Sequence, residues 1–133
     1  MELVINKTAD DLRRMCKSIL NDVCDGIEIT EKNQDEWIDG DHEEALIGCM
    51  VEGRDWISRR VYDERYVLNY NCELIEVQLM VAGGGPSIWV HLSHNSVEVH
   101  GYWGGDRVTV EALHGDGLGI WEYYEELAIF QRA

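Results

Sequence analysis

The sequence contains no run of about 18 apolar residues, the length that a membrane-spanning helix requires. Its N-terminus lacks the basic and then apolar pattern of a secretion signal, and its four cysteines form no C-x-x-C pair. Scattered cysteines are typical of reduced thiols rather than of a disulfide framework or a structural zinc site. We therefore expect a cytoplasmic protein that does not associate with membranes.

Linkers, internal repeats and low-complexity tracts are also absent. The chain of 133 residues is long enough for one domain with a real core, and 45% of its residues are hydrophobic. We therefore expect residues 1–133 to form a single α+β domain.

Basic residues are scarce: 11 stand against 26 acidic residues, which gives a net charge of −15. Such a chain repels nucleic acid and anionic membranes and attracts basic surfaces, including those built to hold DNA or RNA. Residues 22–44, the acidic segment, carry ten carboxylates and a single lysine, Lys32. The alternative is that the acidity serves solubility alone.

Two or three helices are expected. Thr8 and Asp11 form a capping pair, and apolar residues then follow helical spacing as far as a stop at Gly26. Residues 41–53 suggest a shorter helix that ends at Gly53. The C-terminal segment from Leu118 places apolar residues at helical spacing between glutamates. The inward residues are Leu12, Met15, Cys16, Ile19, Leu20 and Val23, then Ala45, Leu46, Cys49 and Met50, then Ile120, Trp121, Tyr124, Leu127 and Ala128.

Residues 74–112 read as a four-stranded antiparallel meander, with turns at 84–85, 95–96 and 104–105. Counting from these turns puts the apolar residues on one face. The expected pairs are Val81–Ile88, Leu79–Val90, Val77–Leu92, Leu92–Val99, Val90–Gly101, Gly101–Val108 and Val99–Val110. The N-terminal and C-terminal helices are expected to pack on this face. A further strand at 65–70 is favoured.

The stretch "VAGGGPSIWV" is therefore a turn between strands. It lacks the Gly-Lys-Ser/Thr ending of a phosphate-binding loop, and no helix follows it to present amide groups to an anion.

The second face of the expected sheet carries two aromatic residues and two histidines among polar side chains. The counted register places Trp89 opposite Tyr102, His91 opposite His100, and Tyr102 opposite Arg107. Such a cluster either stabilises neighbouring strands or lies under the acidic segment, or it forms a contact surface for a partner or a second copy.

Evidence for catalysis or a cofactor is weak. His91 and His100 are expected neighbours, but His94 lies further along at a turn and no cysteine is near, so the sequence favours no metal site. The stretch "DGDHEE" lacks the glycine and the closing glutamate of a calcium loop. No cysteine or serine has the context of an activated nucleophile. We expect no catalytic residues and no cofactor.

The stretch "IEVQLMVAGGGPSIWVHLSHNSVEVHGYWGGDRV", followed by "IWEYYEEL", resembles a group of small proteins encoded by phages and mobile elements. Their shared pattern is an apolar strand, a Gly-Gly-Pro turn, an aromatic strand, a Gly-Tyr-Trp-Gly stretch and an acidic C-terminal helix. The resemblance covers roughly residues 74–128 and implies a setting rather than an activity. In size and acidity the chain is also similar to anti-CRISPR and antirestriction proteins that imitate DNA.

The sequence therefore favours a small acidic binding protein that inhibits a nucleic-acid-handling host defence complex by occupying a basic surface, without binding nucleic acid itself. Two alternatives remain: a metal-dependent or other enzyme that uses the His91 and His100 face, and a structural or assembly protein that forms a homodimer. The expected partner-binding residues are Asp35, Glu36, Asp39, Asp41, Glu43, Glu44, Trp89 and Tyr102.

Overall fold

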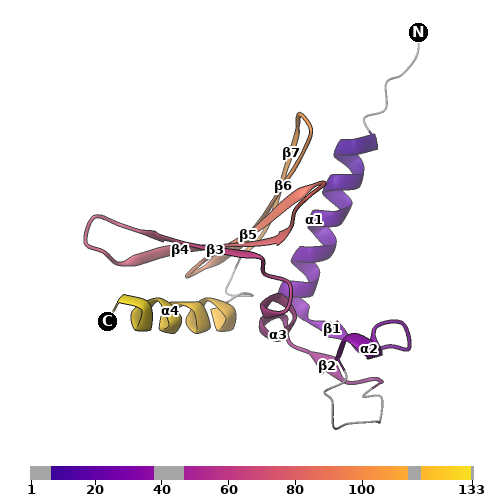
Figure 1. Ribbon diagram of the computed structural model, residues 1–133, viewed down its shortest axis with the longest axis horizontal. Coiled ribbons are helices and arrows are strands. Elements are labelled where there is room, and N and C mark those ends of the chain that lie inside the picture. The colour runs from indigo at the N-terminus through magenta and orange to yellow at the C-terminus, as the bar shows by residue number, and fades with distance from the viewer. Residues whose placement is uncertain (1–6, 38–46, 114–117, 133) are drawn as a thin grey trace.

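The computed structural model describes residues 7–37, 47–113 and 118–132, and it confirms the α+β class (Figure 1). Its main sheet is antiparallel, and its strands lie side by side in chain order. They are β3 (Asp63–Leu68), β4 (Leu74–Ala82), β5 (Ser87–Ser93), β6 (Ser96–Trp103) and β7 (Asp106–Leu113). The meander thus has five strands rather than four, because the segment expected as a strand at 65–70 pairs with β4 from Asp63 onward.

The glycine turns behave as expected at two positions. Gly84 has a φ of 86° and Gly104 a φ of 59°. Residues with a Cβ adopt such φ values only under strain. The connection between β4 and β5 is longer than expected and occupies residues 83–86. A bulge before it places Ala82, rather than Val81, opposite Ile88.

The expected turn at 95–96 is wrong by one residue. His94 and Asn95 form the turn, and Ser93 pairs with Ser96 across it with their hydroxyl oxygens 2.7 Å apart. Moving a turn by one residue moves the register by two, so each residue stays on its expected face but meets another partner. Val99 accordingly lies opposite Val90 instead of Leu92.

Because of the same shift, Gly101 lies opposite Ile88 and not opposite Val90, its expected partner. The last hairpin needs no correction, because the expected pairs of Gly101 with Val108 and of Val99 with Val110 are both present.

The two long helices are confirmed as α1 (Lys7–Asp25) and α4 (Leu118–Arg132). Gly26 follows α1 with a φ of 77°, the left-handed conformation that often ends a helix. The capping role expected for Thr8 with Asp11 is wrong, because α1 already includes Lys7.

The helix expected at 41–53 is absent from residues 47–52, so that prediction is wrong there. Residues 41–46 lie outside the described residues. Met50–Val51 form strand β2, which pairs with β1 (Ile27–Glu28) in a small sheet. The Ile29 amide donates to the Cys49 carbonyl over 2.9 Å, so this backbone has a partner outside any helix. Cys49 and Met50 are accordingly exposed rather than turned inward.

Two short helices flank this small sheet: α2 (Gln34–Trp37) before β2, and α3 (Gly53–Ser58) after it. Gly53, expected to end a helix, instead begins α3.

The apolar core lies between one face of the main sheet and the helices. In Figure 1, α1 lies beside β6 and β7, α4 lies beneath β4 and β5, and α3 contacts both long helices. Each strand from β4 to β6 alternates buried and partly exposed residues, so the inward positions expected on these strands are confirmed. On α1, Met15 was also expected to face inward, but its side chain is 37% exposed. Among the described residues, no helix combines the length and apolar character needed to cross a membrane.

Candidate functional site

The second face of the main sheet, here called the outer face, carries the side chains that could do chemistry. The described helices bury their apolar side chains against the opposite face. The outer face holds Arg65 from β3, Glu76 and Gln78 from β4, Trp89 and His91 from β5, Glu98, His100 and Tyr102 from β6, and Arg107 and Thr109 from β7.

The corrected register changes which of these side chains are direct neighbours. Trp89 lies opposite His100, and His91 lies opposite Glu98, so the expected Trp89–Tyr102 and His91–His100 pairs are wrong. The expected pairing of Tyr102 with Arg107 is present.

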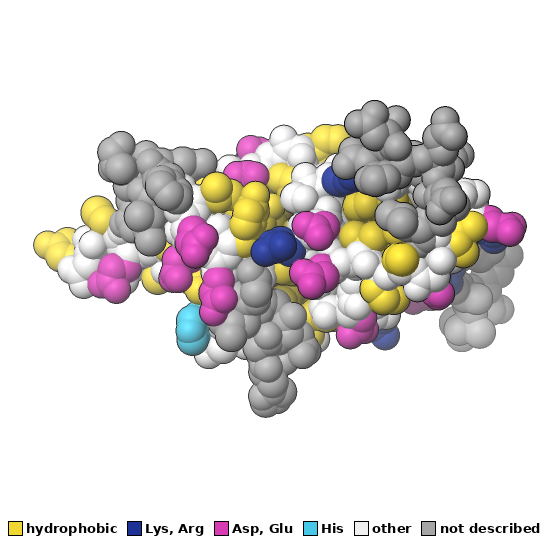
Figure 2. All heavy atoms as spheres, turned by 90° about the horizontal axis from the view of Figure 1, so that it is seen from below, with side chains coloured by type: hydrophobic (Ala, Val, Ile, Leu, Met, Phe, Trp, Pro, Cys, Tyr) yellow, Lys and Arg dark blue, Asp and Glu magenta, His cyan; other side chains and the backbone are white. Residues whose placement is uncertain are grey.

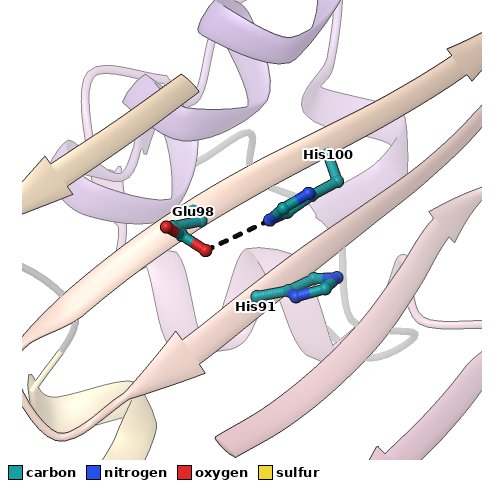
Figure 3. Close-up of side chains that lie close together, drawn as sticks. All are labelled: His91, Glu98 and His100. Atoms are coloured by element: carbon teal, nitrogen blue, oxygen red, sulfur yellow. Dashed lines mark hydrogen bonds and ion pairs between the residues drawn. The ribbon is translucent and has the colours of Figure 1, made fainter. Parts of the chain in front are cut away.

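The two histidines nevertheless meet, because diagonal positions on neighbouring strands are within reach of ring side chains. The imidazole rings of His91 and His100 are stacked, with their centroids 3.9 Å apart and an angle of 26° between their planes (Figure 3).

Each of these two imidazole rings also has a carboxylate partner. His100 Nε2 lies 3.1 Å from Glu98 Oε2 on its own strand, and His91 Nδ1 lies 3.3 Å from Glu76 Oε1 on β4. The second ring nitrogen of His100 lies 3.4 Å from the Thr109 hydroxyl. The side chain of His91 is only 17% exposed and that of His100 only 15%, so the cluster is partly shielded from water.

This environment lowers the pKa of His91 below its usual value. Burial is the main cause and the adjacent His100 adds to it, while the carboxylates of Glu76 and Glu98 act in the opposite direction. A lowered pKa leaves the His91 imidazole neutral near pH 7, with a lone pair on one ring nitrogen.

Beside the histidines lies an open hollow of about 310 Å³, lined by Arg65, Gln78, Trp89, His91 and Tyr102. The Arg65 guanidinium stacks on the Trp89 ring at 4.5 Å from its centroid, and the indole nitrogen donates to the Ser87 hydroxyl over 3.2 Å. The structure thus brings the expected contact residues Trp89 and Tyr102 to one hollow, although they are not direct partners.

The acidic segment is described only in part. Glu36 is exposed on α2 and forms an ion pair of 2.6 Å with Arg60, while its carbonyl accepts a hydrogen bond from Arg59. Nothing is described of the Asp35 side chain. The other expected contact residues of the segment, Asp39, Asp41, Glu43 and Glu44, lie outside the described residues.

Arginines elsewhere in the described chain are also engaged with carboxylates or aromatic rings of the same molecule. Arg14 pairs with Asp11, Arg59 lies over Trp37, and Arg107 lies over Tyr102. Figure 2, seen from the side of α4, shows acidic side chains outnumbering basic ones on that face. Because these arginines are occupied within the molecule, acidic side chains dominate the charge that the described surface presents to a partner.

Sequence reasoning identified His91 and His100 but not their carboxylate partners or Arg65. Glu76 and Glu98 share the outer face with the histidines by simple alternation, and this was the available signal. Glu98 is two residues from His100 on one strand, and the expected pairing of β4 with β5 already placed Glu76 diagonally from His91. The structure adds the side-chain contacts themselves.

Comparison of the chain with protein-family models, with curated proteins and with solved structures found no match. The fold and the site therefore define a class only: an acidic α+β domain with a histidine and carboxylate cluster on the outer face of its sheet.

Proposed function

We propose that this chain is a small acidic binding protein of a phage or mobile element, which inhibits a nucleic-acid-handling host defence complex of the CRISPR or restriction type. It would do so by occupying a basic surface of that complex, with no reaction of its own. The observation that carries the proposal is the charge of −15 together with ten carboxylates and one lysine in residues 22–44.

The described surface supports this proposal. Glu28 and Glu31 of the acidic segment are exposed. DNA carries one charge per about 1.7 Å of its axis, so a competitor for the same groove needs many carboxylates that are not neutralised. Several arginines already contact carboxylates or aromatic rings of the same molecule, so they present little free positive charge to a partner.

Trp89 and Tyr102 would supply a second contact on the outer face. Aromatic side chains that pair with arginine are enriched at the centres of protein interfaces, where they contribute more binding energy than rim charges. In this proposal the carboxylates speed the encounter with the basic partner, and the aromatic residues slow its release.

The test uses a variant in which six carboxylates are replaced by amides: Asp35→Asn, Glu36→Gln, Asp39→Asn, Asp41→Asn, Glu43→Gln and Glu44→Gln. The native protein, immobilised at low salt, should capture a nucleic-acid-binding partner from a host lysate, and duplex DNA should compete with it for that partner. Six exposed ion pairs contribute about 0.2–1 kcal/mol each, so the variant should bind the purified partner by about 1–6 kcal/mol less tightly.

A charge-matched control separates position from total charge. It replaces six exposed carboxylates outside the segment: Asp10, Asp11, Glu52, Glu73, Glu122 and Glu126. The control should keep most of its affinity for the partner. If both variants lose affinity equally, or if neither does, then the acidic segment is not the contact surface and the proposal is wrong.

A further inference from the structure

Three groups on the outer face have the composition of a metal site. His91, Glu98 and His100 each offer one ligand atom, and these atoms lie within 4.8 Å of one another (Figure 3). The residues come from two neighbouring strands, which hold their backbones in a fixed relation. The carboxylate of Glu76 adjoins the same group through its 3.3 Å contact with His91.

The spacing of the donor atoms fits a small divalent ion. Zinc binds nitrogen and oxygen ligands at about 2.0–2.2 Å, so two ligands of a tetrahedral ion lie about 3.3 Å apart. The distance between His100 Nε2 and Glu98 Oε2 is 3.1 Å, and that between His91 Nδ1 and Glu76 Oε1 is 3.3 Å. An ion that replaces the shared proton of either contact therefore needs little movement of those two atoms.

The donor types select among metals. Imidazole and carboxylate together suit zinc and its neighbours cobalt, nickel and copper, whereas magnesium and calcium prefer sites built from oxygen alone. Two histidines and one glutamate form a known three-ligand zinc set, which leaves one position for water or for a fourth ligand such as Glu76.

The surroundings orient one of these ligands as metal sites do. A histidine that binds a metal usually has its other ring nitrogen fixed by a hydrogen bond, and the Thr109 hydroxyl lies 3.4 Å from Nδ1 of His100. Binding through in-plane lone pairs would turn the stacked imidazole rings out of their stack, a change that side-chain rotation can supply.

We infer that His91, Glu98 and His100 form a binding site for a divalent transition metal of the zinc type on the outer face, with Glu76 as a fourth ligand or as a partner that orients His91. The inference is independent of the acidic segment. It also differs from the expectation from sequence, which favoured no metal because His94 lies further along at a turn and no cysteine is near the two histidines.

The experiment is a titration of the purified full chain with zinc by calorimetry, and with cobalt by visible absorption, after removal of adventitious metal. Millimolar magnesium in the buffer occupies the sites made of carboxylates alone. We expect one zinc ion per chain, and cobalt absorption of the intensity that four-coordinate ions give.

The variants His91→Gln, Glu98→Gln and His100→Gln keep a polar side chain at each position while removing the ligand. Each should weaken zinc binding by more than about 100-fold, since even partners outside the first ligand shell contribute 10–100-fold. Thr109→Val should weaken binding by about 10-fold. Circular dichroism identifies any variant that fails to fold, and for such a variant the alanine substitution at the same position takes its place.

Two controls make the result decisive. His94 is exposed in the turn between β5 and β6, so His94→Gln should bind zinc like the native protein. The Cys49→Ser, Cys72→Ser double variant, which removes the two exposed thiols, should do the same. If the native chain takes up no zinc and no cobalt in magnesium, or if these controls lose the ion as the ligand variants do, the inference is wrong. The six-amide variant used to test the proposed function should still bind the ion, so the two ideas can fail separately.

Discussion

At Gly101, helix α1 approaches strand β6 closely. A Cβ added there would lie 2.6 Å from the Cys16 sulfur and 2.8 Å from a methyl carbon of Leu12, both of which are fully buried. Only a residue without a side chain lets the helix lie at this distance. One missing side chain thus helps to set the spacing of two layers.

We therefore expect Gly101→Ala to lower the free energy of unfolding by about 1–3 kcal/mol, the usual cost of forcing extra volume into a packed core. Urea denaturation measures it. The matched control is Gly105→Ala, where an added Cβ meets nothing within 4 Å, and it should change stability by less than about 0.5 kcal/mol. Equal effects of the two substitutions would show that α1 does not pack on β6 at this distance.

At the scale of the element, β5 contributes both to the core and to the outer face. Its Trp89 is half-buried under Arg65, so Trp89→Ala should cost about 0.5–1 kcal/mol of stability through the lost cation–π contact. If Trp89 also anchors the partner, affinity for the captured partner should fall by about 2 kcal/mol or more.

The control for this substitution is Tyr70→Ala, at a fully exposed tyrosine, which should change neither quantity. Calorimetric melting gives the stability, and titration with the purified partner gives the affinity. Should Trp89→Ala lower the stability alone, the outer face would serve the sheet and not the partner.

The elements also show what sequence patterns can and cannot predict. Strict alternation predicted the strands β4 to β7 and their faces, because a period of two residues exists only in extended backbone. Alternation cannot distinguish a turn at 94–95 from one at 95–96, since both keep every side chain on its face. The turn that forms brings Ser93 and Ser96 together, and their hydroxyl groups meet across it.

Other features are beyond local patterns for a different reason. The pairing of Met50 with Glu28 joins two very short strands that are distant in the sequence, and neither strand is long enough to show a period. The site was predictable in half: the histidines were named as neighbours, whereas the contacts of Glu76 and Glu98 depend on side-chain rotamers, which strand alternation does not predict.

At the scale of the whole molecule, like charges repel one another in the folded state. A net charge of −15 on 133 residues destabilises the compact form of the chain. Added salt weakens this repulsion, because the screening length falls from about 30 Å at 0.01 M to about 10 Å at 0.1 M. We expect the free energy of unfolding, measured in urea, to rise with sodium chloride from 0.01 M to 0.5 M.

The six-amide variant is the control for this effect, because it carries less charge and its stability should depend less on salt. The opposite trend, a stability that falls as salt is added, would mean that ion pairs such as Arg60 with Glu36 outweigh the repulsion.

The position of α1 has a consequence for how the chain is made. This helix leaves the ribosome before every strand of the main sheet, yet it packs on β6 and β7, the last two strands of that sheet in the chain. Its buried side chains, among them Leu12, Cys16 and Val23, therefore have no sheet to cover them until most of the chain has been synthesised. The hairpins of the meander need only neighbouring strands and can form as each one emerges. The apolar face of α1 thus lacks the sheet until β6 and β7 have emerged, and an exposed apolar face is the kind of surface that chaperones bind.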